Sequence, residues 1–404
     1  MSTMQAGSAF VTINPELGVD LAGQLHRRFC EFIRDDLEAN ALYLADDGLQ
    51  VLLVSMDLAG LFDATFMSEI RATISAATGV AERNIILTST HTHDGPDTLG
   101  LLPDSVKDEP YLARLKQWLA EVCSQAVQSA RPAKFGWAAG TAHVGFNRRL
   151  CWSDGTHSMY GDSQRPEFTG LEGPDDPTHS VFFAVDEDGK YIAIAHNNCS
   201  HMTCVEQASY ASADFAGEAR RLVRETLGND LPVLYLQGAS GDTSPWNELL
   251  EKDRWNGEQR LREVGALVAG ETLRLLHTAT PVADPIFRHD YEDLTLGIRL
   301  PEADDLAEAR RIATAGEQEA GRGAWILAKS GVVRLQEEYE ADPTEKVAVH
   351  ALRIGDFAIL TNACELYCQF GLDMRRRCPA TVTAIVQLAD GFSGYCPTIP
   401  GLMG

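Results

Sequence analysis

Two histidines one residue apart follow an apolar segment in the first quarter of the chain. The segment NIILTSTHTHDGPDT (84–98) reads as a buried β-strand that delivers His91 and His93 to its end. Side chains at i and i+2 of an extended segment point to the same side, so both imidazoles are expected to face one cavity. Neutral imidazole is the commonest protein ligand for metal ions. Because chance His-x-His pairs are common, the pair alone leaves metal binding, catalysis and an ordinary polar turn open.

Polar residues also follow the ends of other apolar strands. They are His201 after the hairpin 180–201, the turn 240–245 with Asp242 and Ser244, and the pair Glu365 and Tyr395 near the C-terminal strands. Rigid scaffolds assemble sites from the ends of several strands. The recurrence therefore indicates one shared site rather than four unrelated turns.

Strands and helices alternate along the sequence, which is typical of the α/β class. Apolar runs predict strands at 49–60 and 83–90, a strand that runs into a Gly-rich turn at 231–245, a strand pair at 346–365, and a final strand and loop at 381–398. Helical spacing predicts helices at 61–79, 109–130, 214–228 and 258–279. Residues 151–180 read as a long loop, and residues 302–341 as a solvated helical insertion. We predict one large domain over 1–404, with mixed β-sheets flanked by helices and the site at strand ends.

Composition narrows the class of protein. The chain has 404 residues and a formal net charge of -24, which disfavours nucleic acid and anionic membranes as partners. Its start lacks a secretory signal, and no apolar run approaches the roughly 20 residues of a transmembrane helix. The nine cysteines are scattered and read as reduced thiols, which favours a cytoplasmic location. Self-association into a homo-oligomer is left open.

Six motifs together resemble one known family. They occur in the family's order over residues 50–398 and read TSTHTHDGPD, GFNRR, NNCSHMTCVEQASYASADFAG, LQGASGDTSP, NACELY and DGFSGYCPT. The chain thereby resembles the neutral/alkaline (non-lysosomal) ceramidases. The resemblance implies a zinc-dependent amidase that cleaves an N-acyl bond. We expect no C-terminal immunoglobulin-like domain of the kind that the ceramidases proper carry after this region, with a sequence clipped at Gly404 as the alternative.

The resemblance also assigns residues. The positions that match the family's zinc ligands are His91, His201, Glu365 and Tyr395, those that match residues lining the reacting amide are His93 and Arg148, and Ser244 matches a serine once assigned as the nucleophile. His196 is the alternative to His201 as a ligand. We prefer His201 because its distance to Asp214 better matches the family's spacing.

Elementary chemistry agrees with these assignments. Two neutral imidazoles and one carboxylate form a three-ligand zinc site that leaves a position for water, whose pKa zinc lowers towards neutrality. His93 is placed to act as general base or acid, and Arg148 to stabilise an oxyanion or bind a carboxylate. Tyr395 is either a weak fourth ligand or a proton donor.

Three carboxylates and the turn serine are assigned supporting roles. Asp57 and Asp214 are candidates for orienting the histidines, with helix capping an equal alternative for Asp214. For Asp242 and Ser244 we favour support of the site over nucleophilic attack by the serine.

The function expected from the sequence is hydrolysis of an amide by zinc-activated water. A soluble small N-acyl amide is favoured as the substrate over ceramide, which is a membrane lipid. A zinc esterase or lactonase with the same site is one alternative, and a non-catalytic metal-binding protein that retains the fold is another. An amidohydrolase barrel or metallo-β-lactamase is disfavoured, because Gly95 and Pro96 interrupt the His-x-His-x-Asp-His motif.

Overall fold

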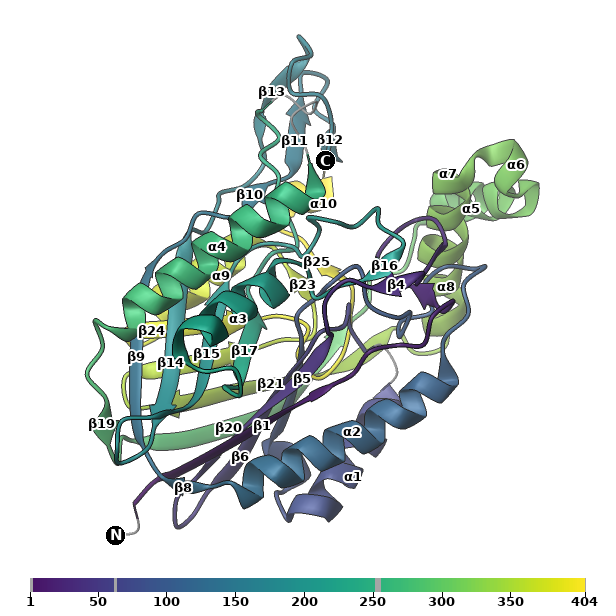
Figure 1. Cartoon of the computed structure of the whole chain (residues 1–404). Helices are drawn as coiled ribbons and strands as arrows, with labels where there is room; N and C mark the ends of the chain where they lie inside the picture. The colour runs from purple at the N-terminus through teal and green to yellow at the C-terminus, as the bar shows by residue number, and fades with distance from the viewer. Residues whose placement is uncertain (1–2, 62–63, 251–255, 404) are drawn as a thin grey trace.

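The computed structural model describes residues 3–61, 64–250 and 256–403. Two five-stranded sheets are stacked at the centre of the molecule, and helices cover their outer faces (Figure 1). The first sheet has the order β7-β6-β5-β1-β8, formed by Ile85–Ser89, Gln50–Met56, Glu38–Ala45, Gln5–Thr12 and Arg131–Pro132. The second has the order β17-β15-β14-β9-β19, formed by Val233–Gln237, Tyr191–Asn198, Thr178–Val185, Lys134–Thr141 and Val282–Ala283.

The period-2 alternation of side chains explains the layers. On β5, Leu42 and Leu44 point into the core between the two sheets, whereas Ala41 and Tyr43 point towards helices α1 (Ala64–Thr78) and α2 (Glu109–Gln128). The second sheet is packed in the same way against α3 (Asp214–Leu227) and α4 (Gly257–Leu276). These layers confirm the predicted α/β class with helices flanking mixed sheets.

A third sheet extends the inter-sheet core. It has the order β20-β21-β22-β24, formed by Phe287–Gly297, Thr344–Ile354, Phe357–Thr361 and Val382–Val386. The Phe357 ring stacks on Phe182 of the second sheet, with 5.1 Å between ring centroids. This packing joins the C-terminal part of the chain to its middle.

Each of the three sheets contains one parallel pair next to the site. β6 pairs with β7, β15 with β17, and β22 with β24. Loops that leave the carboxyl ends of parallel strands emerge at the same edge of a sheet. The segments that follow β7, β15, β17, β22 and β24 carry most of the predicted site residues, whereas Asp57 follows β6 and Arg148 follows the short strand at 146–147.

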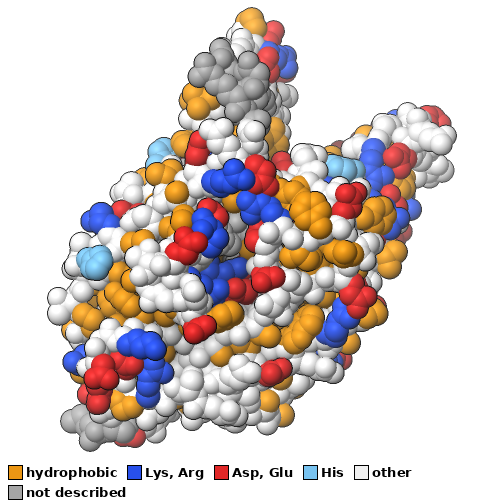
Figure 2. Space-filling view, in the orientation of Figure 1, with side chains coloured by type: hydrophobic (Ala, Val, Ile, Leu, Met, Phe, Trp, Pro, Cys, Tyr) orange, Lys and Arg blue, Asp and Glu red, His pale blue; other side chains and the backbone are white. Residues whose placement is uncertain are grey.

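Two groups of elements project from the body (Figures 1 and 2). One is a small sheet of β11 (Arg149–Trp152), β12 (His157–Met159) and β13 (Phe168–Leu171). The prediction of a long loop at 151–180 was therefore wrong, because its short strands pair with each other and carry no long apolar run. The other is the insertion between β20 and β21, which consists of α5 (Ala303–Ala315), α6 (Glu317–Ala320), α7 (Arg322–Ile326), a π-helix (Leu327–Val333) and α8 (Arg334–Tyr339).

Short elements complete the described chain. They are β2 (Asp20–Leu21), β3 (Arg28–Phe29), β4 (Phe32–Ile33), η1 (Glu82–Asn84), β10 (Phe146–Asn147), β16 (Tyr210–Ala211), β18 (Thr243–Ser244), β23 (Glu365–Leu366), α9 (Cys368–Arg377), β25 (Tyr395–Cys396) and α10 (Ile399–Met403). The structure pairs none of the nine cysteines in a disulfide. Among the described helices, none combines the length and apolar character that a membrane span requires.

Candidate metal centre

His91 lies just beyond β7 in a left-handed backbone conformation. Its φ is 70°, and its backbone N–H donates to the Leu58 carbonyl at 2.9 Å. The sequence predicted an extended backbone at this pair of histidines, and the left-handed conformation of His91 shows that this was wrong. Both rings nevertheless face one point, as predicted. A left-handed non-glycine residue costs on the order of 1–3 kcal/mol and occurs most often at functional sites. The ring Nδ1 donates to the Ala59 carbonyl at 2.6 Å, which leaves the lone pair of Nε2 free.

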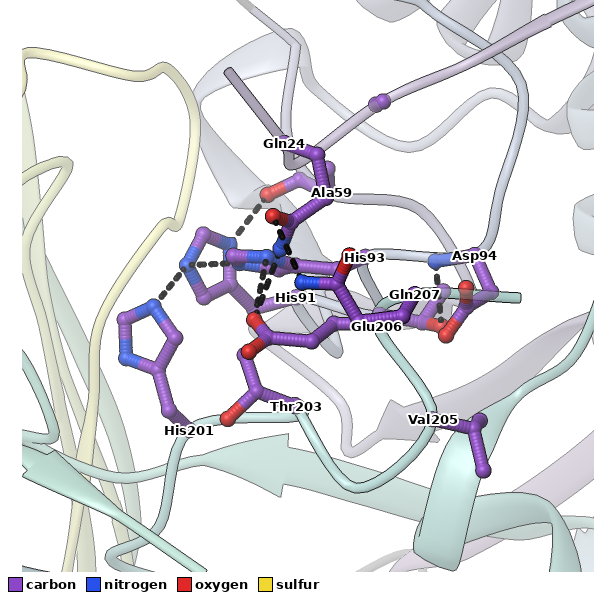
Figure 3. Close-up of polar contacts among 12 residues, drawn as sticks. Gln24, Ala59, His91, His93, Asp94, His201, Thr203, Val205, Glu206 and Gln207 are labelled. Carbon is purple, nitrogen blue, oxygen red and sulfur yellow. Dashed lines mark hydrogen bonds and ion pairs between the residues drawn. The ribbon is translucent and has the colours of Figure 1, made fainter. Parts of the chain in front are cut away.

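His201 approaches the same point from the segment after β15. Its Nδ1 lies 3.0 Å from the Ser240 carbonyl and donates to it, so its Nε2 also presents a lone pair. The two Nε2 atoms of His91 and His201 are 2.9 Å apart (Figure 3). Two lone pairs at this distance repel each other unless a cation lies between them.

Glu365 adds a negative charge to the two imidazoles. It begins β23, which pairs in parallel with β25 so that Glu365 lies opposite Tyr395. Its Oε2 is 3.3 Å from His91 Nε2 and 3.5 Å from His201 Nε2. This buried oxygen has no hydrogen-bond donor among the described residues.

These atoms fit a zinc ion. Tetrahedral coordination with bonds of about 2.0–2.1 Å places ligand atoms roughly 3.4 Å apart, close to the separations of 2.9, 3.3 and 3.5 Å among His91, His201 and Glu365. The donor set of two nitrogens and one carboxylate oxygen suits this metal. Ring nitrogens of His91, His201 and His93 also lie within 4.8 Å of one another, so His93 is an additional candidate ligand.

His93 borders this centre on its open side. Its Nε2 is 3.4 Å from His91 Nε2, and its Nδ1 is 3.9 Å from the carboxylate of Glu206. Burial, together with nearby His91 and Arg148, holds the pKa of His93 well below its usual value. Gly23 packs so closely on this ring that a Cβ would lie 2.4 Å from it, which fixes the ring's position.

Arg148 is the buried cation of the site. Its guanidinium donates to the Gly241 carbonyl at 2.9 Å, to the Tyr160 hydroxyl at 2.5 Å and to the Tyr395 hydroxyl at 3.3 Å. The same group lies 3.2 Å from the ring of His201. Although 46% of Tyr395 is exposed, its hydroxyl faces inward, where burial and the Glu365 carboxylate raise its pKa.

The printed contacts of the three predicted supporting carboxylates go to backbone groups, to Asn147 and to Arg220 rather than to the imidazoles. Asp57 pairs with Arg220 at 2.8 Å and accepts from the Glu38 backbone, so it does not orient a histidine as expected. Asp214 accepts from the backbone N–H groups of Cys204 and Val205 and thereby shapes the loop after His201. Asp242 accepts from Asn147 and from the Cys368 backbone, next to the segments that carry Arg148 and Glu365.

Ser244 is fully buried in β18, away from a general base. Its hydroxyl exchanges hydrogen bonds with the backbone of Trp246, and no histidine among the described residues forms a hydrogen bond with it. The contacts agree with support of the turn and give no basis for a nucleophile.

His196 lies apart from the metal centre. It is on β15, and its Nδ1 is 2.9 Å from the Thr272 hydroxyl, which also contacts His179. Of the two histidines that the sequence left open, the structure brings His201 to His91.

Two neighbours of the site escaped the sequence analysis. Glu206 beside His93 accepts from the Gln24 side chain at 2.7 Å (Figure 3). Tyr160, in the projecting small sheet, contacts Arg148. Neither residue stands at the end of a long apolar strand, which was the signal used to find the others.

Comparison with solved structures identifies the fold. A crystal structure of neutral ceramidase from Pseudomonas aeruginosa superposes with a TM-score of 0.75 over 99% of this chain and 70% of that chain, at 16% sequence identity. The chain has the neutral ceramidase fold. A structure described as ceramidase complexed with C2 matches with the same TM-score, identity and coverage. No family model and no curated protein matches the sequence.

In this neutral ceramidase fold, an apolar pocket of about 370 Å³ opens beside the metal centre. His91, His93, Glu365 and Tyr395 line one part of it. The remaining lining is mostly apolar and comes from three regions, namely Leu21–Leu25, Leu99–Leu102 and the helical insertion with Ile326 and Leu327. The predicted helical insertion is helical and largely exposed, and the structure adds that a few of its residues contribute to this wall.

Proposed function

We propose that the chain is a zinc-dependent hydrolase that cleaves an N-acyl amide. The observation that carries the proposal is the convergence of the Nε2 atoms of His91 and His201 on the unpartnered carboxylate oxygen of Glu365. The neutral ceramidase fold and the apolar pocket support an acyl substrate. A small soluble N-acyl amide remains our preferred substrate.

One group of residues would bind the metal. His91, His201 and Glu365 would hold the zinc, with Tyr395 beside them. Zinc in such a site polarises a carbonyl and lowers the pKa of water, which supplies the nucleophile.

Two groups of the chain act on the amide itself. The lowered pKa of His93 favours its neutral imidazole, the form that is able to accept a proton and return it to the leaving amine. Arg148 carries a permanent charge next to the Tyr395 hydroxyl, where both donors are available to a developing oxyanion.

Metal content tests the first half of the proposal. We expect about one zinc per chain by elemental analysis of protein purified without chelator, and loss of that zinc in His91→Ala and His201→Ala. The exposed His277, at the end of α4, provides the control variant His277→Ala, which should retain the metal. Wild-type protein without metal, or variants that keep it, would exclude the zinc mechanism.

Hydrolysis tests the second half. A series of N-acyl amides and matched esters, followed by release of amine or alcohol, should show turnover of amides that depends on the same two histidines. Turnover of the esters alone would replace the amidase by an esterase. Absence of turnover with a fully loaded site would indicate a metal-binding protein that retains the fold.

A further inference from the structure

The carboxylate of Glu206 reaches the open side of the metal centre from the loop that follows His201. Its side chain is 26% exposed, and Figure 3 shows it running from that loop towards the imidazoles. The Oε2 atom of Glu206 lies 3.9 Å from Nδ1 of His93. That separation exceeds the limit of roughly 3.2 Å for an N–H···O hydrogen bond, so Glu206 does not hold the ring of His93. The close packing of Gly23 does so instead.

The charge of Glu206 has no arginine or lysine partner among the described residues. Its hydrogen-bond donor is the neutral side-chain amide of Gln24, whose Nε2 lies 2.7 Å from Oε2. By contrast, Asp94 on a neighbouring loop is paired with Arg28 at 2.6 Å. A partly buried carboxylate is costly unless an opposite charge lies beside it. The arrangement at Glu206 therefore suits a cation that comes from outside the chain.

Glu206 is held in place by contacts within the chain. Arg28 donates to the Ala22 carbonyl at 2.6 Å and to the Ala208 carbonyl at 2.7 Å. These two alanines lie two positions from Gln24 and Glu206, so the arginine ties together the loops that carry the hydrogen-bonded pair. A charged group whose position is fixed before binding loses little entropy when a ligand meets it.

The site has opposite polarity on its two sides. Arg148 and the Tyr395 hydroxyl, 3.3 Å apart, offer hydrogen-bond donors and a positive charge. Glu206 offers an acceptor and a negative charge beside His93. Cleavage of an amide places negative charge on the carbonyl oxygen, whereas the nitrogen leaves as a protonated amine. The carbonyl oxygen of an amide therefore suits the side of Arg148, and its amine part suits the side of Glu206.

Space for an amine part lies next to this carboxylate. A second hollow of about 470 Å³ is lined by Glu206 together with Thr203, Tyr210 and Glu258. Glu258 is already paired with Arg34 at 2.8 Å, which leaves Glu206 as the acidic group of this lining that can receive a cation.

We propose that Glu206 binds a cationic nitrogen carried by the amine part of the substrate, a few bonds from the scissile amide. The substrate class is then an N-acyl derivative of a diamine, or of a similar amine that keeps a second, positively charged group. The inference rests on the proposed function for the direction in which the amide lies. It assigns Glu206 as a residue that determines specificity.

Three amides that differ in one terminal group test the proposal. N-hexanoyl-1,3-diaminopropane ends in an ammonium group, N-hexanoylbutylamine in a methyl group of similar size, and N-hexanoyl-4-aminobutyrate in a carboxylate. Titration calorimetry with chelator-treated full-length protein measures their binding without turnover. We expect the ammonium amide to bind at least about tenfold more tightly than the methyl amide, and the carboxylate amide to bind most weakly, because a hydrogen bond between charged groups is stronger than a neutral contact.

Two variants of Glu206 and one control assign the effect. Glu206→Gln removes the charge and keeps an acceptor for Gln24, so the ammonium amide should bind no more tightly than the methyl amide. Glu206→Lys should reverse the preference towards the carboxylate amide. The exposed Glu31, whose backbone N–H donates to the Ser209 carbonyl of the same loop at 2.8 Å, provides the control Glu31→Gln, which should behave as wild type.

Equal affinity of wild type for the three amides would overturn the proposal, and this comparison does not depend on the folding of a variant. An unchanged preference for the ammonium amide in Glu206→Gln that is folded by circular dichroism would have the same consequence. So would a preference that is lost in Glu365→Gln instead, because the cation would then lie at the empty metal centre. Loss of zinc from folded Glu206→Gln would make Glu206 a metal ligand and also overturn the assignment.

Hydrolysis by zinc-loaded protein separates this inference from the proposed function. Selective binding of the ammonium amide without hydrolysis of any of the three would sink the amidase and keep the cation subsite. Hydrolysis of all three amides with equal kcat/KM would keep the amidase and exclude the subsite.

Discussion

Replacement of Glu365 by glutamine separates the charge of the metal centre from its shape. In the wild type, Oε2 lies buried without a hydrogen-bond donor, 3.3 and 3.5 Å from ring nitrogens of His91 and His201 that present lone pairs. Glutamine retains the size of the side chain and removes its charge. We expect the variant to bind zinc more weakly, because a neutral amide oxygen is a weaker zinc ligand than a carboxylate.

The size of the effect follows from the length of the chain. With 404 residues and about 2.1 cal/mol/K per residue, the entropy of unfolding is about 0.85 kcal/mol/K. Zinc at a thousandfold excess over its Kd adds about 4.1 kcal/mol to the free energy of unfolding, or about 5 °C in Tm. A hundredfold weaker site leaves about 1.4 kcal/mol, so the same zinc concentration should raise the Tm of Glu365→Gln by only about 2 °C.

Thermal unfolding measures the Tm of wild type and of Glu365→Gln, each with zinc and with chelator. Glu187→Gln, at an exposed carboxylate in the turn between β14 and β15, is the matched control and should reproduce both wild-type values. A wild-type Tm that chelator leaves unchanged would refute the reasoning. So would an equal zinc-induced shift in Glu365→Gln and wild type, since the carboxylate would then not be a ligand.

Three further variants test individual roles. His93→Gln should keep its zinc by elemental analysis and lose about 10²–10⁴ in kcat, as expected for a proton-transfer group, whereas loss of zinc would make His93 a ligand. Arg148→Met should keep zinc and lower kcat by about 10²–10³, and an unchanged kcat would exclude a role in stabilising charge. Burial raises the pKa of Asp214 to about 6, so its protonation stabilises the folded state fully below about pH 3.8, and this contribution is lost as the pH rises through 6. Urea unfolding should show that wild type loses about 2 kcal/mol more than Asp214→Asn between pH 4.5 and 7.5, and equal losses would contradict a raised pKa.

The sequence revealed the main ligand candidates because each follows a strongly apolar strand. His91, His201 and Glu365 all stand where a buried run gives way to polar residues, and this local pattern is readable without the fold. Tyr395 was recognised with Glu365 by the same pattern, whereas Arg148 lacks such a signal and came from the resemblance of motifs. The fold class was predictable for a similar reason, since periodicity marks strands and helices one at a time.

Other features depend on partners far along the chain. The left-handed backbone at His91 is held by carbonyl groups of Leu58 and Ala59, which no local pattern at residue 91 reports. Glu206 is a neighbour of the site only because the fold places its carboxylate beside His93. The helical insertion has charged, exposed faces like any solvated helix. Its few pocket-lining residues cannot be recognised from the sequence, because Arg322 and Arg334 attach it to loops that are distant along the chain.

The parallel strand pairs have a consequence for how the protein would acquire the proposed metal. The atoms of the centre belong to residues far apart in sequence: His91 and His201 are separated by 110 positions, and Arg148 and Tyr395 by 247. Contacts of such high order are slow to form, because loop closure must precede them. The chain can present the three residues together only when the sheet with β22 and β24 is docked on the other two. Under the proposed zinc mechanism, zinc uptake should therefore report that this docking is complete.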